Sequence, residues 1–165
     1  MSSRLMYGLE SAQLGAPQIR RLEVFHLKWL RKILRMKTTF IERSNTNQEV
    51  HRRANEALRR EGSRKTIKSF GETYKRCKIN RMHRILKATP SDPVRNTNLN
   101  TRGQAWAYHG LKQGRPKTKW ANEAMRLYWE EHRDLLPPQY KSATFDYKHI
   151  SHAEALQQVA DNIQD

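Results

Sequence analysis

Residues 18–37, QIRRLEVFHLKWLRKILRMK, decide the fold class of this chain. Apolar residues recur in them every three or four positions, which is the spacing of one face of an α-helix. Pro17 stands just before them, at a position where its missing N–H costs nothing. We expect an amphipathic helix whose apolar stripe packs in a core and whose back is basic. The stripe consists of Ile19, Leu22, Phe25, His26, Trp29, Leu30 and Ile33.

Two further helices are predicted towards the middle of the chain. Thr46 and Glu49 have the spacing of a capping box, which places the start of the second helix. Gly62 is expected to adopt the left-handed backbone conformation that ends this second helix. The third helix is predicted over residues 63–88 and stops before Pro90.

The last third of the chain contains two more predicted helices after an irregular connector. Residues 89–117 are rich in Asn, Gly and Pro, including an Asp-Pro pair expected to turn, and should form the connector. A fourth helix is predicted over residues 117–136. The fifth begins at a second capping box, formed by Ser151 and Glu154. The fold class is therefore mainly α, with about five helices.

The composition limits the core that these helices can form. The chain has 165 residues, about the length of one domain. Only 31 residues are Leu, Ile, Val or Phe, and the formal net charge is +16. This combination is typical of chains close to disorder. We expect a thin helical domain, incomplete if the rest of its core belongs to a larger protein.

The sequence contains no recognisable targeting or membrane-spanning segment. No apolar stretch approaches the roughly 18 residues that cross a bilayer, and the first residues lack the apolar centre of a secretory signal. The single cysteine, Cys77, excludes an internal disulfide framework and fits a reducing compartment. These features predict an intracellular protein, and the basic pairs within residues 52–65 favour the nucleus.

The charge pattern divides the chain into two predicted regions. Residues 19–87 alone have a net charge of +15, whereas residues 121–165 have a net charge of −4. We expect a basic helical region over residues 1–120 that binds a polyanion, followed by an acidic helical tail over residues 121–165. Nucleic acid is the commonest partner of such a basic region, and acidic proteins and anionic membranes are the competing classes.

The basic side chains between the apolar positions are the candidate binding residues. We expect them to neutralise phosphates of RNA or DNA without reading the base sequence, so that binding weakens as salt rises. The alternative is that they form only the solvated back of ordinary helices. Trp120 either anchors the next helix or stacks on a base. The candidates are Lys28, Arg31, Lys32, Arg35, Arg52, Arg53, Arg59, Arg60, Arg115, Lys117 and Lys119.

No catalytic or metal-binding constellation is recognisable in the sequence. The aspartates lie apart along the chain, so the paired carboxylates of two-metal nucleotidyl transfer are missing. A Gly-rich phosphate loop and a His-Glu-x-x-His pair are also missing. Cys77 and His83 lack the further ligands that a zinc site needs. We therefore expect no catalytic site, no metal and no cofactor.

Three segments, in this order, resemble the part of LINE-type non-LTR retrotransposon reverse transcriptases that follows the catalytic palm. Residues 5–11, LMYGLES, are similar to the family's LLYGSE run and lead into the helix quoted above. Residues 46–54, TNQEVHRRA, match the family's TNEEV--RA pattern. Residues 114–120, GRPKTKW, are similar to its GRP---W box. The resemblance extends over about residues 5–125.

This resemblance implies a carboxy-terminal fragment of an RNA-directed DNA polymerase, truncated or degenerate and without the palm, that helps to hold template and primer. The polymerase domain is then a further expected partner. Two alternatives remain: a free-standing basic helical module that binds nucleic acid or chromatin, and an endonuclease domain. The endonuclease needs clustered acidic residues, but the run of Glu123, Glu130, Glu131 and Asp134 is more typical of one solvated helix face.

Overall fold

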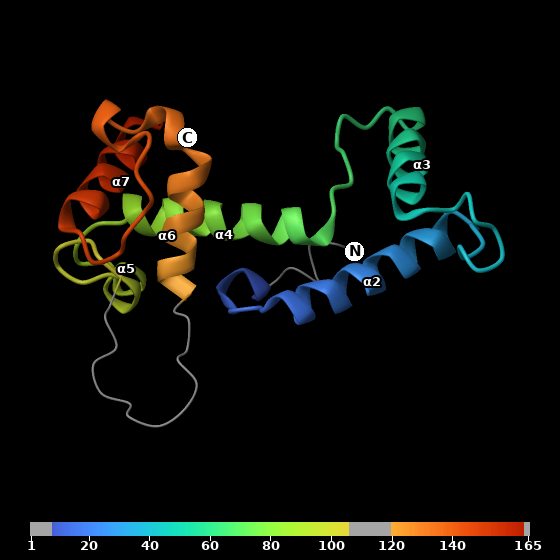
Figure 1. The fold of residues 1–165 in the computed structure, drawn as a ribbon, viewed down its shortest axis with the longest axis horizontal. Helices are drawn as coiled ribbons and strands as arrows, with labels where there is room; N and C mark the ends of the chain where they lie inside the picture. The colour runs from blue at the N-terminus through green and yellow to red at the C-terminus, as the bar shows by residue number, and fades with distance from the viewer. Residues whose placement is uncertain (1–7, 106–119, 164–165) are drawn as a thin grey trace, which may run out of the picture. The chain divides into compact units, whose positions relative to one another are not determined.

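The computed structural model describes residues 8–105 and 120–163, and in these residues the chain is mainly α-helical (Figure 1). The predicted fold class is therefore confirmed. The described residues contain no strand, apart from one isolated bridge between Leu99 and Ala105. The helices are α2 (Ala16–Ile33), α3 (Asn47–Arg60), α4 (Phe70–Lys87), α5 (Pro93–Asn98), α6 (Trp120–Glu131) and α7 (Ile150–Asn162), and the 3₁₀ turns are η1 (Leu9–Ser11), η2 (Arg133–Leu135) and η3 (Pro138–Tyr140). None of these helices is both long enough and apolar enough to span a bilayer.

The chain forms two compact units. The α2–α3 unit consists of residues 14–74, and the α4–α7 unit consists of residues 75–165 together with the first 13 residues. The boundary between them falls inside α4. The charge pattern led us to a different division, at residue 120. Helices α6 and α7, which lie in the expected acidic tail, belong to the same unit as most of α4.

A small apolar core holds α2 on α3. Leu27 and Leu30 of α2 are buried together with Val50 and Ala54 of α3. The partly buried neighbours of this core are Leu34, Met36 and Ile67.

The predicted apolar stripe of α2 is only partly correct. Leu30 is buried as expected, but Phe25, Trp29 and Ile33 are 47 %, 37 % and 64 % exposed. The other buried position is Leu27, which we did not place on the stripe. Helix α2 has two neighbouring apolar rows, and α3 covers the row that contains Leu27 and Leu30.

Helices α2 and α3 end in the same way, with a residue in the left-handed conformation. After α3 this residue is Gly62, with a φ of 73°, as the sequence predicts. After α2 it is Arg35, with a φ of 52°. In both cases the next amide closes the motif: Ser63 donates to the carbonyl of Leu58 at 3.0 Å, and Met36 donates to the carbonyl of Arg31 at 2.9 Å.

Replacing Arg35 by Gly is expected to raise the free energy of unfolding by about 1 kcal/mol, because glycine adopts the left-handed conformation without the steric cost of a Cβ. Guanidinium denaturation followed by circular dichroism measures the change. The matched control is Gly62→Arg, which introduces the same cost after α3 and should lower stability by a similar amount. A destabilised R35G protein would contradict this account of the α2 terminus.

The start of α3 confirms one predicted cap, and the start of α4 corrects another boundary. Thr46 accepts a hydrogen bond from the amide of Glu49 at 3.3 Å, as expected. Helix α4 begins at Phe70 rather than at residue 63. The preceding residues are held without helix because the Asn55 side chain accepts from the amide of Ile67 at 2.6 Å and donates to its carbonyl at 3.2 Å.

A capping box that we overlooked sets the start of α4. Ser69 Oγ accepts from the amide of Glu72 at 3.2 Å, and the Glu72 carboxylate accepts from the amide of Ser69 at 3.2 Å. The carboxylate of Glu23, from α2, also accepts from the amides of Phe70 at 2.5 Å and Gly71 at 3.2 Å. The first turn of α4 therefore has its free amides satisfied by side chains from two segments.

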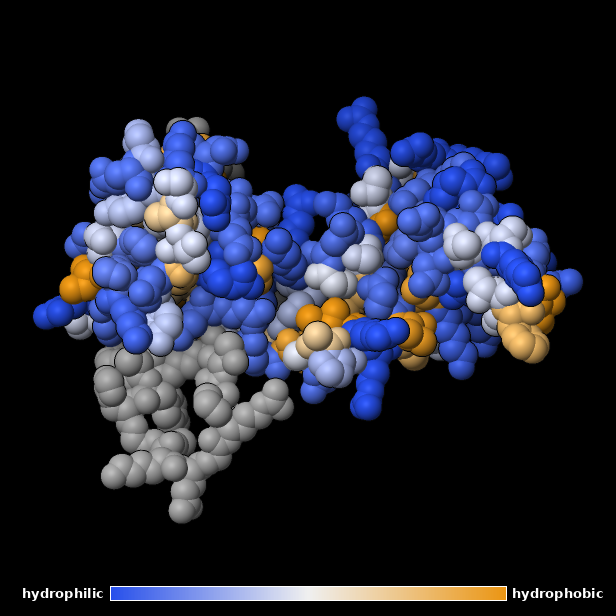
Figure 2. All heavy atoms as spheres, in the orientation of Figure 1, coloured by the Kyte–Doolittle hydropathy of each residue, from blue (hydrophilic) through white to orange (hydrophobic). Residues whose placement is uncertain are grey.

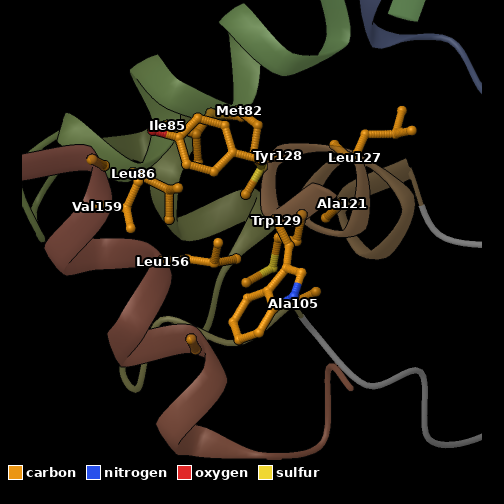
Figure 3. Close-up of a cluster of buried hydrophobic side chains, with 14 of the residues drawn as sticks. Met82, Ile85, Leu86, Ala105, Ala121, Leu127, Tyr128, Trp129, Leu156 and Val159 are labelled. Atoms are coloured by element: carbon orange, nitrogen blue, oxygen red, sulfur yellow. The ribbon is translucent and has the colours of Figure 1, made fainter. Parts of the chain in front are cut away.

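The α4–α7 unit has the larger core. Its described part contains 18 buried residues from α4, α6, α7 and the segments that join them. Leu86 from α4, Tyr128 and Trp129 from α6, and Leu156 and Val159 from α7 point toward one another (Figure 3). The residues of the expected acidic tail thus supply most of this core.

The expected irregular connector contains a short helix, α5. The Asp92 carboxylate accepts from the amides of Val94 at 2.7 Å and Arg95 at 3.4 Å, so the Asp-Pro pair starts a helix instead of making a simple turn. Arg95 then donates to the carbonyl of Leu86 at 2.6 Å and to the side chain of Gln157 at 3.1 Å. This one guanidinium ties the end of α4 to α7.

Helix α6 is shorter than predicted. Within the described residues it runs from Trp120 to Glu131, and the predicted end was residue 136. The 3₁₀ turn η2 follows and changes which side chains face inward. Leu135 is 57 % exposed, whereas its neighbour Leu136 is 2 % exposed.

The predicted capping box at Ser151 is wrong. Helix α7 begins at Ile150, and His149 occupies the N-cap position. The reason is a turn just before the helix, in which the carboxylate of Asp146 accepts from the amide of Lys148 at 2.9 Å. This turn brings the chain into the helix two residues earlier than the capping pattern indicates.

Candidate nucleic-acid interface

The exposed face of α2 carries cations beside apolar side chains. Residues three or four apart share one face of a helix, so Lys28 and Lys32 form one row and Phe25, Trp29 and Ile33 form the next. All five side chains are exposed. We call these five residues the α2 surface. Figure 2 shows hydrophilic and apolar atoms side by side along α2.

Five of the candidate cations have no carboxylate partner within residues 8–105 and 120–163. Lys28 and Lys32 lie on α2, Arg35 directly follows it, and Arg59 and Arg60 end α3; all are exposed. The ion pairs formed in those residues use other basic side chains. The charges of these five cations are therefore not neutralised there and can attract a polyanion.

Arg31, another candidate, has a structural role. Its guanidinium donates to the backbone carbonyl of Asn45 at 3.2 Å and to the side chain of Asn47 at 2.8 Å. Arg31 thus links the last turn of α2 to the segment that starts α3. The sequence predicts Arg31 on the solvated back of the helix, whereas in the structure its guanidinium points to Asn45 and Asn47 at the start of α3.

Arg52 and Arg53 are neutralised by acidic residues of their own helix. Both guanidinium groups donate to the carboxylate of Glu49 at 2.7 Å, and Arg52 also pairs with Glu56. Hydrogen bonds from Arg52 and then Arg53 lower the pKa of Glu49 to about 2. These two arginines are consequently weaker candidates than the unpaired cations.

The aromatic pair on the α2 surface was missed by the sequence interpretation, which placed it in the core. The rings of Phe25 and Trp29 have centroids 6.0 Å apart and an interplanar angle of 67°. The ammonium group of Lys32 lies over the Trp29 ring, 5.2 Å from its centroid. Leu27 and Leu30 form a competing apolar row in the sequence, and helical spacing alone does not choose between the two rows.

The remaining candidates precede Trp120 in the sequence. Arg115, Lys117 and Lys119 are outside the described residues. Trp120, which follows them, packs against the core of the α4–α7 unit, with the Arg81 guanidinium 5.8 Å from its ring centroid. This position supports the anchoring role of Trp120 over base stacking.

A shallow groove in the α2–α3 unit contains one acidic residue with structural partners. The groove has a volume of about 520 Å³ and lies beside Glu23, Gln48 and His51. One carboxylate oxygen of Glu23 accepts hydrogen bonds from the amides of Phe70 and Gly71, at the start of α4. The other oxygen lies 3.6 Å from Nε2 of His51. These contacts hold the Glu23 carboxylate between α3 and the start of α4.

Buried polar groups in the α4–α7 unit are arranged for packing. His83 Nδ1 and the hydroxyl of Tyr128 lie 2.8 Å apart, and the His132 ring lies 4.4 Å from the Tyr128 ring. Burial, and then the charge of Asp161, raises the pKa of Tyr128 to about 12. Burial lowers the pKa of His132. These shifts favour the neutral forms of both groups.

The acidic run considered for an endonuclease is dispersed. Glu123 pairs with Lys78 at 2.7 Å, and Glu130 pairs with Arg126 on the same helix. Glu131 and Asp134 are exposed. Across the part of the chain that the structure describes, no three His, Cys, Asp or Glu side chains gather closely enough to hold a metal ion.

Searches against protein-family models, curated proteins and solved structures found no match to this chain.

Proposed function

We propose that this chain binds the phosphate backbone of nucleic acid through Lys28, Lys32, Arg35, Arg59 and Arg60. The observation that carries the proposal is the absence of carboxylate partners for these exposed cations within residues 8–105 and 120–163. The α2–α3 unit that holds them has a net charge of +9. Exposed cations without carboxylate partners bind any polyanion of regular charge spacing and release its condensed counterions on binding.

We further propose that the chain derives from the region after the palm of a retroelement reverse transcriptase. The three ordered segments that resemble that family support this origin. In such a polymerase the chain would grip template and primer while another domain performs the chemistry. The test is the coding sequence immediately upstream: an in-frame palm with paired aspartates supports the origin, and an unrelated reading frame contradicts it.

Salt is expected to weaken binding steeply. Each phosphate contact contributes a slope of about −0.7 to −0.9 in log affinity against log salt, so five contacts lower affinity about 130- to 500-fold between roughly 50 and 200 mM salt. Filter binding or fluorescence anisotropy with a single strand, its duplex and the RNA–DNA hybrid measures this slope. No retention of any of the three at low salt would overturn the proposal.

Matched variants identify the cations responsible. The triple variant K28Q/K32Q/R35Q should reduce the salt slope by about 2–3, because three phosphate contacts are lost. The control R52Q/R53Q removes two arginines that already pair with Glu49. It should change the salt slope by less than the value expected for one phosphate contact, about 0.7–0.9. Equal losses per charge in both variants would show that binding depends on total charge and not on the unpaired cations.

A free-standing basic helical module is the second candidate. The 18 buried residues in the described core of the α4–α7 unit favour it, because such a core does not need a polymerase domain for burial. A cooperative thermal transition of the isolated chain supports this module, and a broad non-cooperative transition supports the fragment of a larger enzyme.

A further inference from the structure

We propose that the α2 surface selects single-stranded nucleic acid by stacking bases on Phe25 and Trp29 while Lys28 and Lys32 hold the adjoining phosphates. This inference rests on the proposed function and narrows its substrate class. Aromatic side chains beside a cationic track are the usual means of binding single strands without sequence preference. A duplex keeps its base faces stacked inside, so it can use only the cations.

The two rings are positioned for such contacts. They come from residues four apart on one helix, which places them on the same face with their centroids 6.0 Å apart. Phe25 is 47 % exposed and Trp29 is 37 % exposed. Another face of α2 packs on α3 through Leu27 and Leu30. Because that packing fixes the rotation of the helix, the two rings are presented outward.

The neighbouring cations suit a ligand that has both rings and phosphates. The Lys32 ammonium lies 5.2 Å from the centroid of the Trp29 ring. A stacked base would take over the ring face, and the long side chain of Lys32 could then turn to a phosphate. Lys28 lies one turn earlier on the same row. Neither lysine has a carboxylate partner in the part of the chain that the structure describes.

Electrostatics disfavours a second copy of this chain as the occupant. A symmetric contact through the α2 surface would bring Lys28 and Lys32 of one copy close to the same residues of the other. Like charges in such a contact cost several kcal/mol unless carboxylates intervene. The exposed part of α2 supplies none, because its one acidic residue, Glu23, is engaged with His51 and the start of α4.

The shape of the apolar row disfavours a membrane surface. A helix that lies in a bilayer interface buries a broad apolar face with its charged face opposite. On α2 the apolar row of Phe25, Trp29 and Ile33 is narrow and has lysines on one side and the face packed on α3 on the other. A flexible single strand can follow such a narrow row more easily than a planar bilayer can.

The test compares two double variants of the full chain. Phe25→Ala with Trp29→Ala should lower affinity for a single strand about tenfold or more, because each stacked base contributes about 1–3 kcal/mol. The affinity for a duplex should change less than twofold. The control, Val24→Ala with Ile41→Ala, truncates apolar side chains of the same unit that lie outside the α2 surface and are 61 % and 67 % exposed. It should leave both affinities unchanged.

A third variant separates stacking from general apolar contact. Phe25→Leu with Trp29→Leu keeps apolar bulk but removes the aromatic faces, so it should lose single-strand affinity like the alanine variant. Thermal unfolding by circular dichroism confirms that each variant folds. If the chain binds single strand and duplex but the ring variants weaken both equally, the inference fails while the proposed function stands. If the chain binds neither, the proposed function itself fails.

Two other results would also overturn the inference. One is a dimer that the alanine variant converts to monomer, measured by analytical ultracentrifugation. The other is ring-dependent binding to anionic phosphatidylserine vesicles without ring-dependent binding to single strands.

Discussion

Replacing Trp129 by Ala is expected to lower the free energy of unfolding by about 3–5 kcal/mol, the range for large aromatic truncations in a core. Trp129 has no exposed surface. Its ring contacts the rings of Tyr140, Phe145 and His152 at centroid distances of 5.9, 5.5 and 4.8 Å, and its indole N–H donates to the carbonyl of Ala143 at 3.2 Å. Truncation leaves a cavity and an unsatisfied carbonyl.

The matched control for this prediction is Trp29→Ala. Trp29 is the same residue type, but it is 37 % exposed on α2 and belongs to no buried core. Its truncation should change stability by about 1 kcal/mol or less. Guanidinium denaturation of both variants measures the contrast. Equal losses of unfolding free energy in the two variants would contradict the burial of Trp129 against the segment that joins α6 to α7.

Both ends of α3 were predictable because contacts within one turn set them. Thr46 caps α3 and Gly62 ends it, since both act through the backbone of their own turn. The start of α4 was less accessible to sequence reasoning. The capping pattern of Ser69 and Glu72 is present in the sequence and was overlooked. The non-helical segment before it depends on two hydrogen bonds between the side chain of Asn55, on α3, and the backbone of Ile67, which the sequence does not indicate.

The buried face of α2 was not decided by its own periodicity. The helix has enough apolar residues for two rows, and either row satisfies the helical spacing. The choice depends on what the partner helix offers, and the small Ala54 of α3 receives Leu27 and Leu30. Hence Phe25 and Trp29, expected in the core, remain on the surface.

The candidate site was predictable as a basic region but not residue by residue. Sequence position shows how many cations a helix carries, whereas the structure shows which of them are already paired. Arg52 and Arg53 could have been discounted, because Glu49 lies three and four residues away on the same helix. Arg31 could not, because its partners at the start of α3 are set by tertiary packing.

A second large loss of stability is expected for Lys78→Met, about 3 kcal/mol. The Lys78 side chain is completely buried, and its ammonium donates to Glu123 at 2.7 Å and to Gln13 at 3.1 Å. Methionine keeps most of the volume but leaves the Glu123 carboxylate without its cation. The side chain of Glu123 is 26 % exposed, which places the loss at the lower end of the range for buried pairs.

A double variant distinguishes the unpaired charge from lost packing. Lys78→Met with Glu123→Met removes both charges together. It should be more stable than Lys78→Met alone, because no buried carboxylate is left unpaired. If the double variant is as unstable as the single variant, the loss comes from packing around Lys78 and not from the ion pair.

Acid should reduce the loss caused by Lys78→Met. Burial alone would raise the pKa of Glu123, but hydrogen bonds from Lys78 and Gln13 outweigh it and lower the pKa. In the unmodified chain this carboxylate therefore contributes stability above its ordinary pKa, which is lost as the pH falls through the lowered value.

In Lys78→Met the burial of Glu123 and the hydrogen bond from Gln13 remain but the cation is gone, so the pKa of Glu123 should be higher than in the unmodified chain. The ionised Glu123 then contributes less stability in the variant, so acid removes less stability from the variant than from the unmodified chain. Denaturation at about pH 7 and again near the ordinary pKa of Glu, about 4.3, measures the difference between the two proteins. The difference should be smaller at the lower pH, and a difference that does not change would mean that Lys78 stabilises the fold through its alkyl chain alone.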